Sequence, residues 1–177
     1  MKNFKWPVAV LAFILTLALS VGAVYLRQRQ LVNEPLFKRI SELEPVKTVE
    51  LQQEDNTQVV VVSLEYVDDL AITHRELNEE INRLLGQKRY RLEIVDERNQ
   101  ALEAAFVAVH LSLYEGEHRG NFTEMGSQVK DTLKSMGISD HKVFVDSENI
   151  YLQIRDGDAY LYEIVKREKQ GKDGEHV

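Results

Sequence analysis

Two histidines and two glutamates near the middle of the chain are the residue types best suited to bind a metal ion: His110, Glu115, Glu117 and His118. At about 100° per residue on a helix, His110 and His118 lie about 80° apart, which would let both reach one zinc ion. Helical zinc ligands normally follow each other at i, i+3 or i+4, however. The favoured interpretation is therefore a helix end with solvated acids, and a metal site at His110 and His118 is the alternative.

Two pairs of aspartates are the other groups that could carry chemistry. Asp68 and Asp69 follow an apolar run, where a carboxylate pair could act in acid–base catalysis. Neighbouring acids in a loop are usually solvated, so we expect no catalytic pair. Asp156 and Asp158 fit the start of a calcium loop, but the positions for the remaining ligands hold Ala-Tyr-Leu at 159–161. A turn explains both of these acids.

The motifs of common enzymes are missing from the sequence. It contains no G-x-x-x-x-G-K-S/T loop, no G-x-G-x-x-G after a strand, no H-E-x-x-H and no G-x-S-x-G. Since the chain has no cysteine, disulfides, thiolate zinc sites and cysteine nucleophiles are excluded as well. We favour a non-enzymatic protein without a cofactor, and a metal-dependent or hydrolytic enzyme is the alternative.

Three tyrosines near the C-terminus are the candidate contact surface. Tyr151, Tyr160 and Tyr162 cluster on a predicted hairpin, and Tyr160 and Tyr162 share one face of their strand. An exposed aromatic patch of this kind would suit binding to another protein. The favoured alternative is that the rings pack across the strands and onto the helices.

The charge of the chain is unevenly distributed. The net charge is −7, but the first 29 residues hold Lys2, Lys5, Arg27 and Arg29 and no acid. The remainder is therefore four units more negative, at −11. Such a surface repels phosphate backbones, so nucleic acid is excluded as a partner, and it also disfavours lying flat on anionic lipid.

The uncharged segment at residues 7–26 predicts a membrane anchor. About 20 residues at about 1.5 Å each match a hydrocarbon core of about 30 Å. Trp6 and Tyr25 sit where aromatic rings favour the interface, and Arg27 and Arg29 can reach the headgroups. The predicted anchor residues include Pro7, Leu11, Phe13, Leu15, Leu19, Tyr25 and Leu26.

A cleaved signal peptide is the alternative to a retained anchor. Lys2 and Lys5 form a basic start, and small residues permit cleavage near Ala23, which would give a secreted protein. The apolar run is longer than a signal peptide needs, so we favour a single-pass signal-anchor. Basic residues flank both ends of the run, and the short basic start favours an N-inside orientation. We therefore expect the following domain outside the cytoplasm, with lipid and other membrane or envelope proteins as partners.

The remaining elements must position these residues. After a short basic tail at 1–6 and the anchor, residues 27–56 read as a polar stalk with a short helix in which Leu36, Ile40 and Leu43 share one face. The folded domain is expected at 57–166, followed by a flexible charged tail at 167–177. Within it, the apolar run after Thr57 predicts a central strand, and Thr73 to Glu76 fits the capping box of a helix.

The rest of the predicted domain consists of further strands and helices. Residues 90–95 predict a strand, the helix after Asn99 carries an apolar stripe from Leu102 to Leu113, and a further helix starts at Asn121. Three strands follow, the last two joined by the Asp156-Gly157 hairpin turn. The order β-α-β-α-α-β-β-β predicts an α+β fold with a small mixed sheet and helices on one face. Its first two strands should be parallel.

Overall fold

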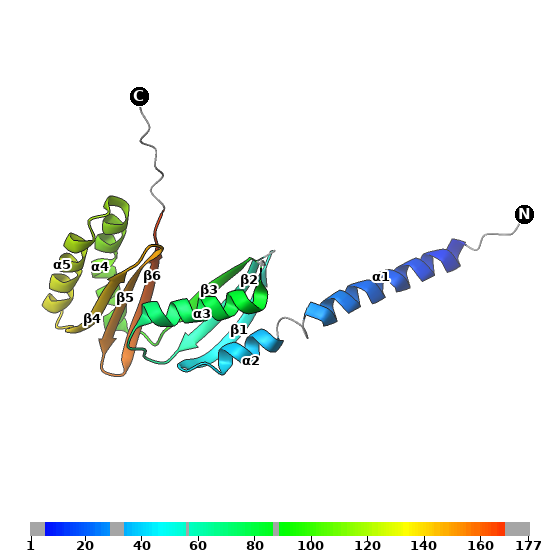
Figure 1. The fold of residues 1–177 in the computed structure, drawn as a ribbon, viewed down its shortest axis with the longest axis horizontal. Coiled ribbons are helices and arrows are strands. Elements are labelled where there is room, and N and C mark those ends of the chain that lie inside the picture. The colour runs from blue at the N-terminus through cyan, green and yellow to red at the C-terminus, as the bar shows by residue number, and fades with distance from the viewer. Residues whose placement is uncertain (1–5, 29–33, 56, 87–88, 169–177) are drawn as a thin grey trace, which may run out of the picture.

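The computed structural model describes residues 6–28, 34–55, 57–86 and 89–168, and the side chains of residues 7–9 and 24–28 lie outside that description. The helices are α1 (Trp6–Gln28), α2 (Glu34–Ser41), α3 (Leu70–Leu85), α4 (Gln100–Arg119) and α5 (Phe122–Ser135). The strands are β1 (Val46–Glu54), β2 (Thr57–Leu64), β3 (Tyr90–Val95), β4 (Asp140–Val145), β5 (Asn149–Asp156) and β6 (Ala159–Lys166). The chain forms two small sheets, and Figure 1 shows α2 and α3 beside the first sheet, α4 and α5 beside the second, and α1 apart from both.

The first sheet has the order β1-β2-β3. Its central strand β2 pairs with β1 antiparallel and with β3 parallel, so the predicted parallel pair joined through a helix is confirmed. Val60, Val62 and Leu64 of β2 are fully buried, because α2 and α3 supply the apolar side chains that pack in the same core. From α3 these include Leu77 and Ile81.

The folded domain begins earlier than the sequence predicts. Residues 46–54 form the edge strand β1, although they were expected to belong to a polar stalk. The reason is that an edge strand buries little, and Val49 is the residue of β1 whose side chain is buried. The short helix α2 was predicted, but Leu36 and Ile40 lie fully within the core, so α2 is part of the domain.

The second sheet has the order β4-β5-β6 and is antiparallel throughout. The predicted hairpin is confirmed, and Gly157 adopts φ 62° in its turn. Helices α4 and α5 cover one face of this sheet. Along its strands, buried side chains that face these helices alternate with buried side chains that face the first half of the domain. Those facing the helices are Ile150, Leu152, Ile154, Leu161 and Val165.

The predicted α+β class is therefore confirmed, with a different division of the sheet. Five helices and two three-stranded sheets occur in the described residues, where one sheet was expected. The predicted order of strands and helices from residue 57 onward agrees with the structure, but it omits β1, and an order of strands along the chain does not determine which strands share hydrogen bonds. The second sheet lies between α4 and α5 on one side and α3 with the residues after β2 on the other (Figure 1).

The start of α3 also differs from the prediction. Asp69 is its N-cap, and the Asp69 carboxylate accepts a hydrogen bond of 3.0 Å from the amide of Ile72. Thr73, predicted as the cap, lies one turn inside, where its hydroxyl donates to the carbonyl of Asp69 at 3.0 Å. An ionised carboxylate is the better acceptor at a helix N-terminus, which accounts for the earlier start.

The N-terminal segment forms the expected helix, α1. Figure 1 shows it extending away from the two sheets. Its described apolar side chains are exposed, among them Leu11 and Phe13 at 69% each, Leu15 at 62% and Leu19 at 67%. Among the residues that the structure describes, no helix is both long and apolar enough to cross a membrane. The side chains of Pro7, Tyr25 and Leu26, like residues 1–5 and 169–177 of the predicted tails, fall outside the description.

Candidate functional site

The three tyrosines predicted as a contact surface lie inside the fold. Tyr151 and Tyr160 are each 3% exposed and Tyr162 is 4% exposed, on the face of the second sheet that is turned toward the first sheet. They pack in the same cluster as Leu64 and Leu70. The rings are thus covered, as the packing alternative expected, although by the first half of the domain and not by α4 or α5.

The hydroxyl groups of two of these rings hold the segment that leaves β2. Tyr160 donates to the carbonyl of Leu64 at 2.5 Å. The hydroxyl of Tyr162 donates to the carbonyl of Glu65 at 3.1 Å and accepts from the amide of Val67 at 2.6 Å. The polar ends of the tyrosines therefore satisfy backbone groups that a buried loop would otherwise leave unpaired.

A chain of polar side chains continues this junction to the solvent. His74 of α3 lies 3.2 Å from the hydroxyl of Tyr151, which donates to the carboxylate of Asp146 at 3.0 Å. Asn78 contacts the other ring nitrogen of His74 at 3.0 Å and accepts a hydrogen bond of 2.8 Å from the hydroxyl of Tyr90. The chain therefore runs from β3 through α3 to the loop after β4.

Burial shifts the pKa values of two groups in this row of hydrogen-bonded side chains. It lowers the pKa of His74, with Asp146 and Glu148 acting in the opposite direction. Burial also raises the pKa of Tyr151 to about 12. A neutral imidazole beside a phenol and a carboxylate could move a proton, but every one of these groups is engaged with a neighbour. We therefore interpret the chain as part of the junction between the two sheets.

The predicted metal candidates lie along the second half of α4, from His110 to His118. His110 donates from Nδ1 to the carbonyl of Val107 at 2.7 Å. Glu115 forms an ion pair with Arg119 at 2.5 Å, and a carboxylate oxygen of Glu117 accepts from the amide of Glu168. Within the described residues, no group of three or more metal-binding side chains is assembled, at His110 and His118 or elsewhere.

The two aspartate pairs have structural positions. Asp69 caps α3, and the backbone carbonyl of Asp68 accepts a hydrogen bond of 2.5 Å from Lys142. Asp156 is the last residue of β5, and Asp158 lies in the turn that leads into β6. A shallow hollow of about 280 Å³ lies beside this turn, lined by Gly137, Ile138, Ser139, Asp140, Arg155, Asp156 and Gly157.

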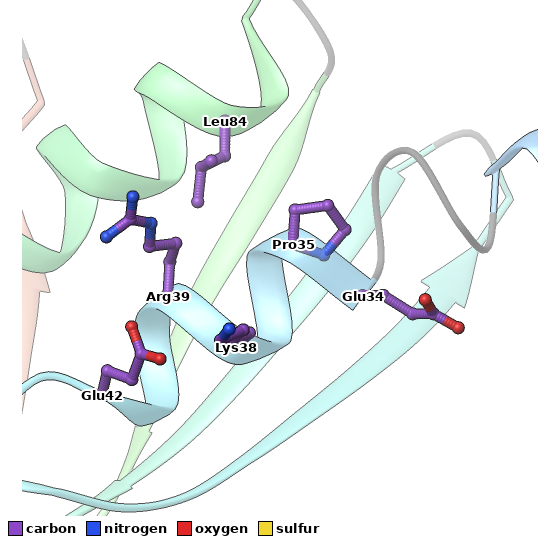
Figure 2. Close-up of a pocket in the computed structure, with 6 residues that line it drawn as sticks. All are labelled: Glu34, Pro35, Lys38, Arg39, Glu42 and Leu84. Atoms are coloured by element: carbon purple, nitrogen blue, oxygen red, sulfur yellow. The ribbon is translucent and has the colours of Figure 1, made fainter.

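A larger hollow of about 490 Å³ lies between α2 and α3 (Figure 2). Arg39 extends from α2 toward α3, and Leu84 points back toward it. The lining residues are Glu34, Pro35, Lys38, Arg39, Glu42 and Leu84. Its two acids and two bases balance in charge, so the hollow offers no dominant sign with which to select an ion.

The most unusual surface of the domain is the outer face of α4. One side of this helix is buried against β5, β6 and α5 through Leu102, Ala105, Val109 and Leu113. The opposite side is also apolar, yet Val107 is 57% exposed, Leu111 71% and Tyr114 52%. Ala104 and Ala108 are exposed on the same side. A helix that is apolar all round is normally covered on all sides.

The sequence prediction did not include this surface, because the stripe from Leu102 to Leu113 is the longer of the two on α4. Val107, Leu111 and Tyr114 are spaced i, i+4, i+7, which is the spacing of one helical face. Their face is opposite the stripe that begins at Leu102. Two apolar stripes on opposite faces of one helix therefore predict that the helix makes contacts on both sides.

Comparison with known proteins gives no further assignment. The chain matches no protein-family model, and no curated protein shows significant similarity to it.

Proposed function

We propose that this chain is a non-enzymatic, membrane-anchored protein whose α+β domain binds another protein through the outer face of α4. The single observation behind the proposal is the second apolar face of α4, with Leu111 71% exposed at its centre. Burial of apolar side chains is the main favourable term in protein association. Isolated apolar residues on a surface are ordinary, but a row of them along one helical face is typical of an interaction site.

The anchor is α1. Two features support its insertion into a bilayer: residues 7–26 carry no charge, and the described apolar side chains of α1 from Leu11 to Leu19 are exposed. About 20 uncharged residues suffice for a hydrocarbon core of about 30 Å. The domain then lies outside the cytoplasm, where its partners are membrane or envelope proteins. Its acidic surface is consistent with a domain that stands off anionic lipid.

The anchor and its orientation are tested in one experiment. A reporter that is active only outside the cytoplasm is fused after Val177, and the fusion is separated into soluble and membrane fractions. We expect active, full-length fusion protein in the membrane fraction that resists extraction by high salt or alkali. An inactive reporter would reverse the orientation, and a soluble product shortened to a start near Ala23 would identify a secreted protein.

The interaction surface is tested separately with a photo-crosslinking amino acid. It is placed at Leu111 and, as a matched control, at Ser127, an exposed position on the neighbouring helix α5. Crosslinked products that depend on the position at Leu111 are expected. Equal labelling from Leu111 and Ser127 would contradict the assignment of α4 as the interaction surface.

A further inference from the structure

The outer face of α4 carries small and large, and acidic and basic, side chains at positions matched about Leu111, apart from Val107, which is placed opposite Glu115. We infer that its partner is a second copy of this chain, bound in an antiparallel helix pair about a two-fold axis that passes through Leu111. This inference deepens the proposed function and rests on it. In such a pair, residues equally far before and after Leu111 face each other, because a two-fold interface uses the same patch on both subunits.

Side-chain sizes match in this register. Ala108 faces Tyr114 of the second copy, and Ala104 faces His118, so a small residue meets a large one on both sides of the axis. Leu111, the most exposed of the three large apolar residues on this face, meets its own copy at the axis. Alternation of small and large residues lets two helices interdigitate at the usual axis separation of about 8–10 Å.

Charges match in the same register. Glu103, in the first turn of α4, faces Arg119, in its last turn. Both side chains are accessible for this contact, with exposed fractions of 53% and 65%. Within one chain, Glu103 pairs with Arg98 at 3.2 Å and Arg119 pairs with Glu115 at 2.5 Å. Antiparallel pairing therefore extends two existing ion pairs into networks across the interface, and it aligns the helix dipoles favourably.

The parallel alternative is less well matched. Two parallel copies of α4 would place Glu103 beside Glu103 and Arg119 beside Arg119, so like charges would meet at both ends. The face is only one helix wide, and an interface of this size is weak for molecules that diffuse freely. Anchoring both copies in one bilayer raises their effective concentration, which strengthens a small contact without any new interaction.

The experiment uses single cysteines, since the chain has none of its own. The full chain carrying Leu111→Cys is expressed, its membranes are isolated, and mild oxidation is followed by non-reducing electrophoresis. Ser127→Cys on α5 is the matched control. A disulfide requires Cα atoms within about 7 Å, so we expect at least about ten-fold more dimer from Leu111→Cys than from the control. Equal dimer from both would overturn the pairing.

The register is tested with charge reversals in the Leu111→Cys background. Glu103→Arg alone and Arg119→Glu alone should each reduce the disulfide dimer several-fold, since like charges then meet at both ends. Combining the two substitutions restores opposite charges across the axis and should restore the dimer. Circular dichroism of each variant identifies loss of fold, which is not expected at exposed positions. Failure of the combined variant to recover, with its fold intact, would overturn this register.

The remaining outcomes separate this inference from the proposed function. A photo-crosslinker at Leu111 that captures only a different protein would overturn the second copy as partner and leave α4 as an interaction surface. Capture of nothing would overturn both. A chain found in the soluble fraction that still forms the Leu111→Cys dimer would support the pairing and overturn only the anchor.

Discussion

Gln153 holds the chain around Val67 with both ends of its amide. Its Nε2 donates to the carbonyl of Val67 at 2.6 Å, and its Oε1 accepts from the amide of Leu70 at 2.9 Å. Gln153 lies on β5 and is only 5% exposed, so this contact joins the second sheet to the turn that starts α3. It is the polar counterpart of the tyrosine contacts, and both connect the second sheet to the segment that leaves the first sheet.

Replacing Gln153 with Leu should therefore destabilise the whole domain. The substitution leaves the Val67 carbonyl and the Leu70 amide buried without partners, at a cost of about 1–3 kcal/mol for each group. Urea unfolding of the full chain in detergent micelles, followed by circular dichroism, measures the loss. The matched control is Gln128→Leu on the exposed side of α5, which should change the free energy of unfolding by less than about 0.5 kcal/mol. Equal losses from both variants would contradict this interpretation of the junction.

The pH dependence of stability should depend on His74. Its folded-state pKa is lowered by burial, so the folded protein favours the neutral ring. The stability that this shift contributes is present above the ordinary pKa of 6.5 and is lost as the pH falls through 6.5 toward the lower folded value. Asp146 and Glu148 act against the shift and limit its size.

The variant His74→Gln tests this dependence because its side chain has no charge to gain. Denaturant unfolding is measured at pH 8 and at pH 5.5 for both proteins. The native chain should lose more of its free energy of unfolding between these two values than the variant does. Identical losses would show that other groups account for the pH dependence.

Much of the secondary structure could be predicted, because most of its signals are local. The strand Tyr90–Val95 and the hairpin turn at Gly157 are marked by alternation and by turn chemistry. Membership of a sheet is not local. The residues next to β1 in the sequence do not indicate that Val49 packs in one core with α2 and α3. From sequence alone, residues 46–54 therefore resemble a stalk. The same limit applies to Tyr160 and Tyr162, because an aromatic face on a hairpin looks alike whether a partner or the chain's own loop covers it.

The start of α3 offers a direct comparison between local sequence and structure. Asp69→Ala removes the observed N-cap and should lower the free energy of unfolding by about 1 kcal/mol. Thr73→Ala removes the residue that the sequence pattern favours as the cap. Since the Thr73 hydroxyl donates to the carbonyl of Asp69 and the Asp69 side chain is the cap acceptor, we expect a smaller loss from Thr73→Ala. Hydrogen exchange of the first-turn amides of α3 should increase in the Asp69 variant alone. A larger loss of stability from Thr73→Ala than from Asp69→Ala would instead support Thr73 as the N-cap.

Gly116 is the close-contact point between α4 and α5. A Cβ atom built at this position would lie 2.6 Å from Cβ and Cγ of Met125, well inside van der Waals contact. Gly116→Ala should therefore destabilise the domain by about 1–3 kcal/mol, despite the better helix propensity of alanine.

The matched control is Gly126→Ala in α5, where the added methyl group meets nothing within 4 Å. There only the propensity gain remains, and we expect stabilisation by about 0.5–1 kcal/mol. Opposite signs of the two changes, measured by thermal unfolding of the full chain in the same detergent, would establish that Gly116 is required by the helix contact. The result also bears on the outer face of α4, because a helix displaced from Met125 would carry Leu111 with it. Gly116→Ala combined with Leu111→Cys should therefore give less disulfide dimer than Leu111→Cys alone, while Gly126→Ala leaves the yield unchanged.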